Sequence, residues 1–344
     1  MRVAIIHDGA TDSWAPADVA SVMENVHEVR TALRAAGHEV EIVPVRLREL
    51  RWLQRAARAD LVFNLCESVG GMARYEDCVV GALELTGVPF SGCRFSAITA
   101  CHRKHQANAL LQLGGVPIPL FILAQGNQVP ADFPLPAIVK PNGEDASIGI
   151  DGEAVCTSRR ALRKRVARML EQFSEVLVQA YVPGREFNVG FVGSLMLPVS
   201  EISFERMPAG SWPIVSYAAK WVPGSPEDEG TQPVCPARIP ADLAKRLGTV
   251  ARRAWDYLAG SEGYGRVDLR VDDAGQVWVL EVNPCPDISR DAGLARMARA
   301  EGWTYEEMLA RIVDEALGRA QRAAAAAATT APVPVPGAEA LRTA

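Results

Sequence analysis

One stretch, residues 263–284, constrains the fold of this chain more than any other, because it predicts a β-hairpin. Polar and apolar residues alternate over 266–271, and a β-branched, apolar run extends over 277–283. The intervening residues 272–276 supply the turn. Pro284 ends the second strand, since proline cannot donate to a sheet ladder. The rest of the chain is organised around this hairpin.

Four polar side chains of the hairpin are predicted to face one another. Residues two apart on a strand project together, which pairs Arg266 with Asp268. The same spacing pairs Glu281 with Asn283. A turn at residues 273–276 would place Asp268 opposite Glu281, with their Cβ atoms about 4.5–5.5 Å apart. It would equally place Arg266 opposite Asn283.

The spacing of Asp268 and Glu281 indicates a cation site. Two carboxylates held this close repel each other unless something positive lies between them. Oxygen ligands with an amide beside them suit Mg²⁺, which takes one or two carboxylates and completes its shell with water and phosphate oxygens. Arg266 would then face an anion bound to that metal. The alternative is an ordinary surface hairpin with a solvated charged face.

Length and composition indicate a globular protein of two or three domains. The chain has 344 residues, of which 49% are hydrophobic and 22% charged. Its net charge of −5 gives no basic surface for nucleic acid. We expect no membrane span, because no apolar run reaches about 18 residues, and no signal peptide, because Met1 leads directly into a predicted strand.

The cysteines favour a reducing compartment. There are seven, an odd number, and no two form a C-x-x-C pair. This pattern indicates neither a zinc site nor a disulfide framework. Reduced thiols are typical of cytosolic proteins, so we predict a cytoplasmic location.

The first 97 residues alternate strands and helices. Short apolar runs predict three buried strands, at residues 3–7, 40–45 and 61–65. Helical spacing predicts three helices, at residues 17–36, 47–58 and 76–85. This order predicts a parallel, doubly wound sheet, whose ligands collect beyond the carboxyl ends of the strands. His7, Asp8, Asn64 and Glu67 lie at those ends. For His7 alone, a structural histidine is the favoured interpretation.

From residue 98 onward the strands and helices follow a mixed order. Predicted strands lie at residues 136–141, 175–179, 187–192 and 197–203. Predicted helices lie at residues 96–113, 159–173, 241–258, 291–300 and 304–320. Residues 207–229 are predicted to be a loop. The alanine and proline tail from residue 323 predicts disorder, with a frayed extension of the last helix as the alternative.

A predicted phosphate-binding loop accompanies the hairpin. Lys140 ends a strand and is followed by small residues over 142–149. Free N–H groups and the Ser147 hydroxyl could wrap phosphates there, and the lysine would add a point charge. The loop lacks the G-x-x-x-x-G-K pattern of a P-loop. Lys140 alone is also consistent with a plain surface lysine. A further strand runs into a loop that ends in Glu186. Together with the lysine-ended strand, its loop of small residues and the polar hairpin, it forms a specific combination.

In this order the features resemble the ATP-grasp superfamily and, within it, the D-alanine–D-alanine ligase group, over about residues 1–318. The motifs that carry the resemblance are Phe63-Asn-Leu, Glu76-Asp, Leu83-Glu-Leu-Thr-Gly-Val-Pro-Phe-Ser-Gly92, Lys104, Val139-Lys-Pro, Glu144, Ser147-Ile-Gly149, Gln179, Gly184-Arg-Glu186, Lys220, Gly265-Arg-Val-Asp268 and Leu280-Glu-Val-Asn-Pro284. The resemblance implies a Rossmann-like pre-ATP-grasp domain at 1–97, a central ATP-grasp subdomain at 98–182, a C-terminal ATP-grasp subdomain with the hairpin at 183–318, and a tail at 323–344.

The resemblance also implies which residues bind ATP and two Mg²⁺ or Mn²⁺ ions. The expected phosphate side consists of Lys104, Lys140, Glu144, Ser147 and Lys220. The expected adenine and ribose side consists of Gln179, Tyr181, Val182 and Glu186. The expected metal ligands are Asp268, Glu281, which would bridge the ions, and Asn283. Gln179 replaces a glutamate that is usual in the family, and its amide can still accept a hydrogen bond from the adenine amino group.

The implied reaction is ATP-dependent ligation of a carboxylate to an amine, joining amino acids through an acylphosphate with release of ADP and phosphate. Its expected catalytic residues are Arg266, Lys220 and Ser147. The alternatives are a true D-alanine–D-alanine ligase of peptidoglycan synthesis with altered substrate contacts, and a non-catalytic nucleotide-binding regulator. Amino acids and ATP are the expected partners, and the family implies a homodimer.

Departures from the family pattern concentrate on the amino-acid site. Residues that link the substrate to the closing loop in the family correspond to about Val26, Ala146 and Trp221, and a histidine after the third strand is replaced by the Cys66-Glu67 region. A glycine and a serine after the Asn-Pro segment become Asp287 and about Ala292. The remaining candidates for substrate contacts are Glu24, Glu28, Glu67, Asp287 and Ser289. We therefore predict an amino acid or amine other than D-alanine.

Overall fold

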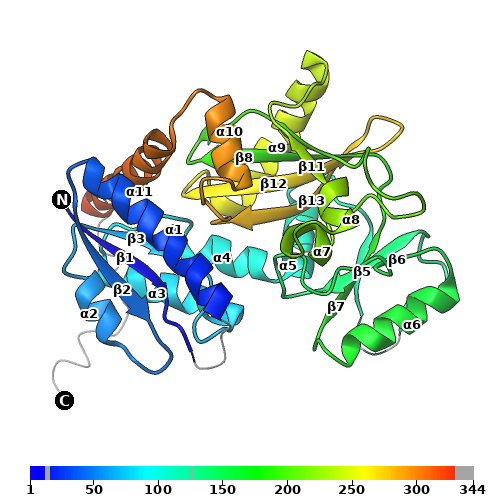
Figure 1. The fold of residues 1–344 in the computed structure, drawn as a ribbon, viewed down its shortest axis with the longest axis horizontal. Helices are drawn as coiled ribbons and strands as arrows, with labels where there is room; N and C mark the ends of the chain where they lie inside the picture. Colours follow the sequence, from blue (N-terminus) through cyan, green and yellow to red (C-terminus); the bar gives the residue numbers. More distant parts are fainter. Residues whose placement is uncertain (12–15, 125, 127, 330–344) are drawn as a thin grey trace.

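A three-stranded parallel sheet forms one end of the protein. This computed structural model describes residues 1–11, 16–124, 126 and 128–329. The sheet has the strand order β2–β1–β3, and its strands are β1 (Arg2–Asp8), β2 (Glu39–Val45) and β3 (Leu61–Leu65). The intervening helices are α1 (Pro16–Ala35), α2 (Arg51–Ala56), the short η1 (Ala73–Tyr75) and α3 (Glu76–Thr86). Figure 1 shows this sheet at the opposite end of the molecule from β5, β6 and β7.

Alternate side chains of β1 enter two different cores, as a doubly wound sheet requires. Val3 and Ile5 pack with α1, whereas Ala4 and Ile6 pack with α2 and α3. The predicted parallel, doubly wound sheet is confirmed. The predicted helix at 47–58 is too long, because α2 begins only at Arg51.

The predicted hairpin forms the edge of an antiparallel six-stranded sheet. Along the main path, β11 (Gln232–Val234), β10 (Ser200–Ser203), β8 (Arg185–Val192), β12 (Tyr264–Val271) and β13 (Val277–Pro284) follow one another. The two-residue strand β9 (Leu195–Met196) pairs with β8. Helix α9 (Ala241–Ala259) covers this sheet, and its Trp255 stacks on Phe191 with ring centroids 5.4 Å apart.

A smaller antiparallel sheet carries the segment that contains Lys140. Its order is β4 (Phe121–Ala124), β7 (Val176–Ala180), β5 (Ala137–Pro141) and β6 (Val155–Cys156). Helix α6 (Arg159–Leu170) packs Leu162 and Val166 against it in a separate core.

The predicted single helix at 96–113 is wrong, because two helices occupy this range. Helix α4 (Phe95–His102) ends at Arg103, whose extended φ of −112° and ψ of 105° break the helical path before α5 (Lys104–Leu113). The break is stabilised where the Lys104 amide donates to the carbonyl of Asn142. Both helices pack in the core of the six-stranded sheet, with Ile98 and Leu111 buried there. The predicted domain boundary at residue 98 therefore falls inside α4.

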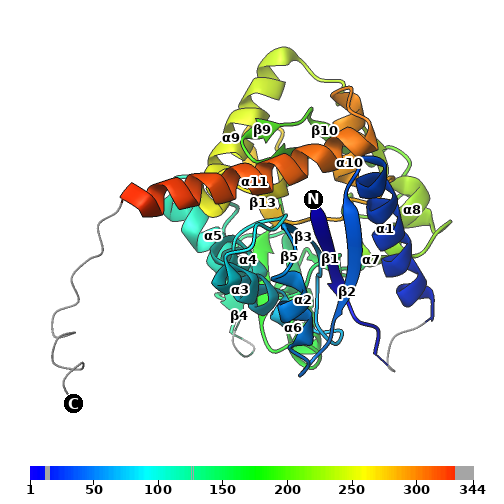
Figure 2. The same ribbon diagram turned by 90° about the vertical axis from the view of Figure 1, so that its left-hand side faces the viewer.

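The last helices return to the N-terminal sheet. Helix α10 (Gly293–Ala300) is followed by α11 (Tyr305–Thr329), which Figure 2 shows extending across the molecule. Residues Leu309 and Ile312 of α11 share a core with Val3 and Ile5 of β1. The predicted disorder is wrong for residues 323–329, where the alternative, an extension of the last helix into the alanine tract, is confirmed by α11. Alanine has the highest helix propensity of any residue. Residues 330–344 of the predicted tail lie outside the described residues.

The predicted loop at 207–229 is also wrong in part. It contains α7 (Tyr217–Trp221) and α8 (Pro226–Gly230). Each is capped by a serine, since Ser216 accepts from the amide of Ala219 and Ser225 from that of Asp228. Of the helices in the described residues, none combines the length and the apolar character that crossing a membrane requires.

Candidate active site

The hairpin brings its two carboxylates face to face. Asp268 on β12 pairs with Glu281 on β13, and Arg266 pairs with Asn283, so the predicted facing is confirmed. The predicted turn at 272–276 is confirmed, and the four-residue turn at 273–276 from which the facing was derived is wrong. Val271 pairs with Val277, which leaves residues 272–276 as the turn. A β-bulge at Leu280 absorbs the difference of one residue and restores the pairing at the site.

Asp268 is held by donors from three strand positions. Arg266 donates to both of its oxygens, at 2.6 and 2.9 Å, and the Asn283 amide donates at 2.9 Å. The Asn188 amide donates to it at 2.7 Å from β8, on the other side of β12. Sequence reasoning missed Asn188, although its spacing of two from Glu186 on one strand is a signal for a shared face.

Glu281 lies among lysines that come from other elements. The Lys104 ammonium lies 2.6 Å from Glu281 and 2.8 Å from Asp145. Burial by itself would raise the pKa of Glu281, but the charges of Lys104 and then Lys140 outweigh it and lower that pKa well below its usual range. Asp145 was not among the predicted site residues. Its position in the loop directly after the strand of Lys140 was the signal from which it could have been predicted.

Lys140 is buried at the end of β5 and has no counter-ion. Its side chain is 7% exposed, and no carboxylate oxygen of the described chain lies within 4 Å of its ammonium group. Desolvation lowers the pKa of Lys140, and the carboxylate of Glu281 partly offsets this effect. A buried cation without a partner is costly unless a ligand supplies the anion.

The predicted phosphate-binding loop is attached to helix α7. Ala146 and Ser147 have φ angles of 54° and 59°, in the left-handed region. The Ser147 hydroxyl donates to the carbonyl of Val215 at 2.9 Å, and the Trp221 indole N–H donates to the carbonyl of Ala146 at 2.9 Å. These two bonds connect residues 142–149 to the segment that carries Lys220. In the part of the chain that the structure describes, Glu144 forms no ion pair.

Lys220 faces the same charged cluster from α7. The atoms packed around Lys220 desolvate it, and together with the nearby charge of Arg266 they lower its pKa. The carboxylates of Asp268 and Glu281 act in the opposite direction. The structure thus brings together cations from β5, α5, α7 and β12 around two carboxylates of the hairpin.

The residues predicted for adenine and ribose lie on β7, on the link that follows it, and at the start of β8. Gln179 is buried on β7, and its amide nitrogen has no hydrogen-bond partner within the described residues. Tyr181 packs edge to face against Trp212, with ring centroids 5.1 Å apart. An unpartnered buried amide of this kind fits a heterocycle that can hydrogen-bond to it.

Arg270 holds Glu186 and the backbone of Val182 in place on this side of the site, and sequence reasoning did not identify it. It donates to Glu186 at 3.0 and 2.9 Å and to the carbonyl of Val182 at 2.8 Å, and it also donates to the carbonyl of Pro213. Arg270 pairs with Glu186 across β12 and β8. The alternation Arg266, Asp268, Arg270 on one strand was the signal that could have found it.

The predicted amino-acid contacts are only partly brought together. Glu67 and Asp287 lie close enough for the charge of Asp287 to raise the pKa of Glu67. Glu28 is engaged elsewhere, with Arg290 at 3.7 Å, and the Ser289 hydroxyl donates to Asp287 at 2.9 Å. Glu24 is exposed on α1, and it has no ion pair with any described residue.

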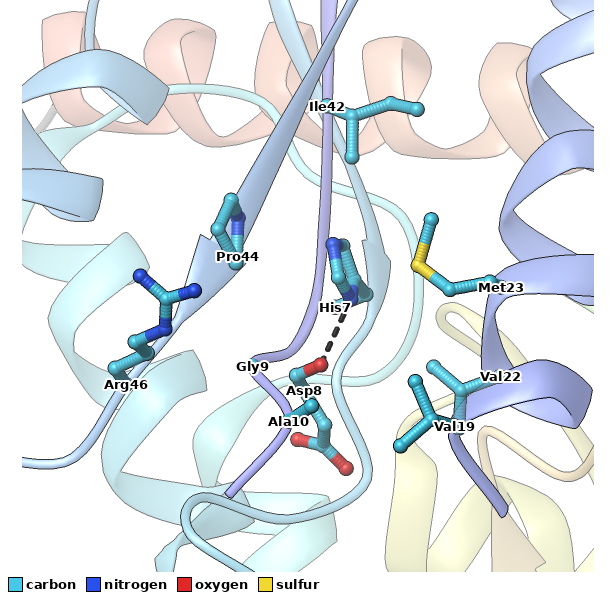
Figure 3. A pocket seen from close by; sticks show the side chains of 10 residues that line it. All are labelled: His7, Asp8, Gly9, Ala10, Val19, Val22, Met23, Ile42, Pro44 and Arg46. Carbon is cyan, nitrogen blue, oxygen red and sulfur yellow. Dashed lines mark hydrogen bonds between the residues drawn. The ribbon is translucent and has the colours of Figure 1, made fainter. Parts of the chain in front are cut away.

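Two further acidic residues lie near Glu67: Asp8, which was predicted with it at the strand ends, and Glu76, which was not predicted as a substrate contact. Asp8, at the end of β1, accepts from the amide and hydroxyl of Ser68 at 3.1 and 2.9 Å. Glu76 begins α3, and its carboxylate is close enough to Glu67 to be influenced by it. His7 instead bonds the carbonyl of Asp8 and lines a neighbouring apolar pocket, shown in Figure 3. The pocket's other lining residues are Asp8, Gly9, Ala10, Val19, Val22, Met23, Ile42, Pro44 and Arg46.

The donor set fits a polyphosphate better than a tightly chelated metal. Among the described residues, no three His, Cys, Asp or Glu side chains are grouped so that they could hold a metal ion. Two facing carboxylates and an amide suit Mg²⁺, which keeps several other ligands from water and phosphate. The unpaired Lys140 beside them suits the phosphate itself.

Comparison with known proteins places this chain among ligases. The family described as D-ala D-ala ligase C-terminus matches residues 123–314. The D-alanine–D-alanine ligase of Synechococcus sp. (strain JA-3-3Ab) is 30% identical over 320 residues, which cover 89% of this chain and 92% of that protein. The D-alanine–D-alanine ligase of Gluconobacter oxydans (strain 621H) is 31% identical over 93% of this chain and 100% of that protein.

The fold is shared with a solved structure. The crystal structure of the D-alanine–D-alanine ligase from Bacillus anthracis complexed with ATP has a TM-score of 0.72 to this chain. It covers 94% of this chain and 99% of that one, at 22% sequence identity. This likeness shows that the two chains share a fold.

Proposed function

This chain belongs to the D-alanine–D-alanine ligase family, and from that premise we propose that it is an ATP-dependent ligase that joins amino acids. The observation that carries the proposal is the buried Lys140, which has no counter-ion in the described chain and lies beside the facing carboxylates of Asp268 and Glu281. This combination suits the phosphates of a nucleotide together with a divalent cation.

The proposed nucleotide site extends along the two antiparallel sheets. Its phosphate side consists of Lys104, Lys140, Glu144, Ser147 and Lys220. Its adenine and ribose side consists of Gln179, Tyr181, Val182 and Glu186. Asp268, Glu281 and Asn283 would hold Mg²⁺, which when bound neutralises charge on the phosphates. The unpartnered amide nitrogen of Gln179 supports the placement of the adenine.

The proposed chemistry proceeds in two stages. The carboxylate of the first amino acid attacks the γ-phosphorus of ATP, ADP leaves, and an acylphosphate forms. The amine of the second amino acid then adds to the acyl carbon, a proton leaves the nitrogen, and phosphate departs as the new C–N bond remains. Phosphoryl transfer requires mainly positioning and charge stabilisation, which this site's cations can supply.

Arg266 has the position required to stabilise negative charge that develops during phosphoryl transfer and during the addition of the amine. Its guanidinium is oriented by two hydrogen bonds to Asp268, and it lies within the influence of Glu281. Removal of one such donor typically costs on the order of 10²–10³ in rate. The bonds from Ser147 and Trp221 join the loop at 142–149 to the segment that carries Lys220, and a loop held beside the phosphates would exclude water from the acylphosphate.

A second candidate is D-alanine–D-alanine ligation itself. It is favoured by the names of the relatives that match this chain over most of its length. Because cellular ATP would be the substrate, we also propose action in the cytoplasm. A homodimer is proposed on the family's behaviour alone.

A matched pair of hairpin variants tests the proposal. Asp268→Asn and Glu281→Gln should each reduce ATP-dependent phosphate release by at least about 100-fold. Asp273→Asn, which makes the same chemical change in the exposed turn of the same hairpin, should leave it unchanged. The assay uses a matrix of amino-acid pairs with ATP and Mg²⁺, and product masses identify the active pairs. Full turnover by either site variant would refute the proposal.

A further inference from the structure

A cavity of about 290 Å³ lies between the first half of α1 and the carboxyl ends of β1 and β2. Figure 3 shows the side chains around it, and we call it the α1 pocket. Of the described residues, none that is proposed above for the nucleotide or the metal lines it. Doubly wound sheets bind ligands beyond the carboxyl ends of their strands. The pocket therefore lies where this fold class binds ligands, but outside the proposed nucleotide site.

One apolar stripe of α1 contributes both to the core and to the α1 pocket. Val26 and Val29 are buried and share a core with the N-terminal sheet. Val19, Val22 and Met23 precede them at the same helical spacing, but they are only partly buried and line the pocket. Strand β2 adds two further half-buried apolar residues to the lining. Accessible apolar surface on both walls favours a ligand with an apolar body.

His7 supplies a hydrogen-bond acceptor to the α1 pocket. Its side chain is 6% exposed, and its Nδ1 lies 2.8 Å from the carbonyl of Asp8, so Nδ1 carries the proton. Burial lowers the pKa of His7, as the nearby charge of Arg46 also does, so the ring is neutral and Nε2 keeps its lone pair. Nε2 has no partner among the described residues, yet it is not sealed from solvent, so it is accessible from the pocket that His7 lines. This acceptor favours a ligand that donates an N–H or O–H.

Arg46 supplies a positive charge at the edge of the α1 pocket. Within the described chain, no carboxylate oxygen lies within 4 Å of its guanidinium. A Cβ on Gly9 would lie 2.5 Å from Cγ of Arg46, so the glycine allows the arginine side chain to lie across the end of β1. Asp8 also lines the pocket, but its carboxylate accepts from the amide and the hydroxyl of Ser68, at 3.1 and 2.9 Å. A free guanidinium at the edge of the pocket favours a carboxylate.

The two polar groups of the pocket lie near each other. The charge of Arg46 reaches His7 strongly enough to lower the pKa of that histidine. A ligand that contacts both must therefore carry its carboxylate and its hydrogen-bond donor on neighbouring atoms. This is the arrangement of an α-amino acid or an α-hydroxy acid. The described lining holds a single histidine and a single carboxylate, which is too few ligands for a metal ion.

We propose that the α1 pocket binds a small α-amino or α-hydroxy acid with a large apolar side chain. Arg46 binds its carboxylate, Nε2 of His7 accepts from its α-ammonium or α-hydroxyl group, and its side chain packs against Val19, Val22 and Met23. The site is separate from the proposed nucleotide site, so the proposal does not depend on the ligase function. Alanine has the two polar groups but lacks the apolar contact.

The test measures the binding of matched ligands to the full chain by calorimetry, without ATP. Leucine and 2-hydroxy-4-methylpentanoate, each in both chiralities, carry all three features and differ only in the donor. 4-Methylpentanoate lacks the donor, 3-methylbutylamine lacks the carboxylate, and alanine lacks the apolar side chain. We expect leucine or the hydroxy acid to have a Kd at least about 10-fold below the Kd of each of the three partial ligands.

Variants assign each contact to a residue. Arg46→Met should raise the Kd of the complete ligand about 10-fold and leave that of 3-methylbutylamine unchanged. His7→Phe, which keeps a ring but removes the acceptor, should erase the difference between the complete ligand and 4-methylpentanoate. Val22→Phe should fill the pocket and abolish binding there. Arg58→Met removes an exposed arginine that does not line the pocket and has no ion pair with a described residue, and it should change none of these values.

Three results would overturn the inference. They are equal affinity for leucine, the hydroxy acid and alanine, unchanged binding of the complete ligand by Arg46→Met, and binding that persists in full in a folded Val22→Phe, since such binding belongs to another site. If circular dichroism shows that Val22→Phe does not fold, the Arg46→Met and His7→Phe series still decides, because neither change adds volume to the core. Failure of this inference leaves the ligase function untouched, because the assay contains no ATP.

Discussion

The ammonium group of Lys104 lies 2.6 Å from a carboxylate oxygen of Glu281, although the two residues are far apart in the sequence. The contact depends on the break at Arg103, because Lys104 is the first residue of α5 and its amide bonds to Asn142 at the start of the predicted phosphate-binding loop. One residue therefore connects a helix start, the loop and the hairpin carboxylate.

Loss of Lys104 should weaken both the fold and nucleotide binding. Lys104→Met leaves the Glu281 carboxylate with less counter-charge, and breaking a buried pair from one side costs about 3 kcal/mol of unfolding free energy. Urea unfolding followed by circular dichroism measures the change, and calorimetry measures the affinity for ATP. Lys164→Met, an exposed lysine on α6, serves as the control and should change neither. Unaltered stability of Lys104→Met would contradict this account.

Arg270 and Glu186 should behave as a coupled pair. Arg270→Met leaves a buried carboxylate without its partner and should lower the free energy of unfolding by about 3–5 kcal/mol. Adding Glu186→Gln to that variant should recover at least about 1 kcal/mol, because the uncompensated charge is removed. A double-mutant cycle in urea measures the coupling. Strict additivity of the two changes would show that the pair does not act as a unit.

The indole of Trp221 should hold the loop at 142–149 closed. Trp221→Phe keeps an aromatic ring but removes the donor to the Ala146 carbonyl, a bond worth about 1 kcal/mol or less at this exposed position. We expect faster proteolysis in the loop and several-fold more phosphate release without an amine, because water would reach the acylphosphate. Trp278→Phe removes a comparable bond to Asp272, away from the loop, and should cause neither effect.

Glu67 should make the protein less stable as the pH rises towards neutrality. Its pKa is raised from 4.5 to about 7 on folding, chiefly by burial and by neighbouring carboxylates. The folded chain therefore binds the proton more tightly, so this contribution is complete below pH 4.5 and is lost as the pH rises through about 7. Glu67→Gln should match the parent's thermal midpoint at pH 5 and exceed it at pH 8. A variant less stable than the parent at pH 8 would rule out this repulsion.

The local patterns of the chain were sufficient to predict its hairpin and its parallel sheet. Alternation with period two assigned Asp268 and Glu281 to facing positions, and short apolar runs identified the strands that carry Asp8, Asn64 and Lys140. Such patterns report which face of an element is buried, because a strand or helix repeats its faces at a fixed period. The break at Arg103 has no comparable periodic signal.

The amino-acid sequence by itself determined the elements of this protein and the chemical character of their faces. Only the tertiary structure decided which faces meet: Lys104 with Glu281, and Arg270 with Glu186. These contacts join residues far apart along the chain, so they depend on how sheets and helices pack rather than on local spacing. A carboxylate such as Glu67 has an ordinary environment in its own segment, and its pKa rises only because the folded chain desolvates it and brings the charges of Asp287 and Asp8 near it.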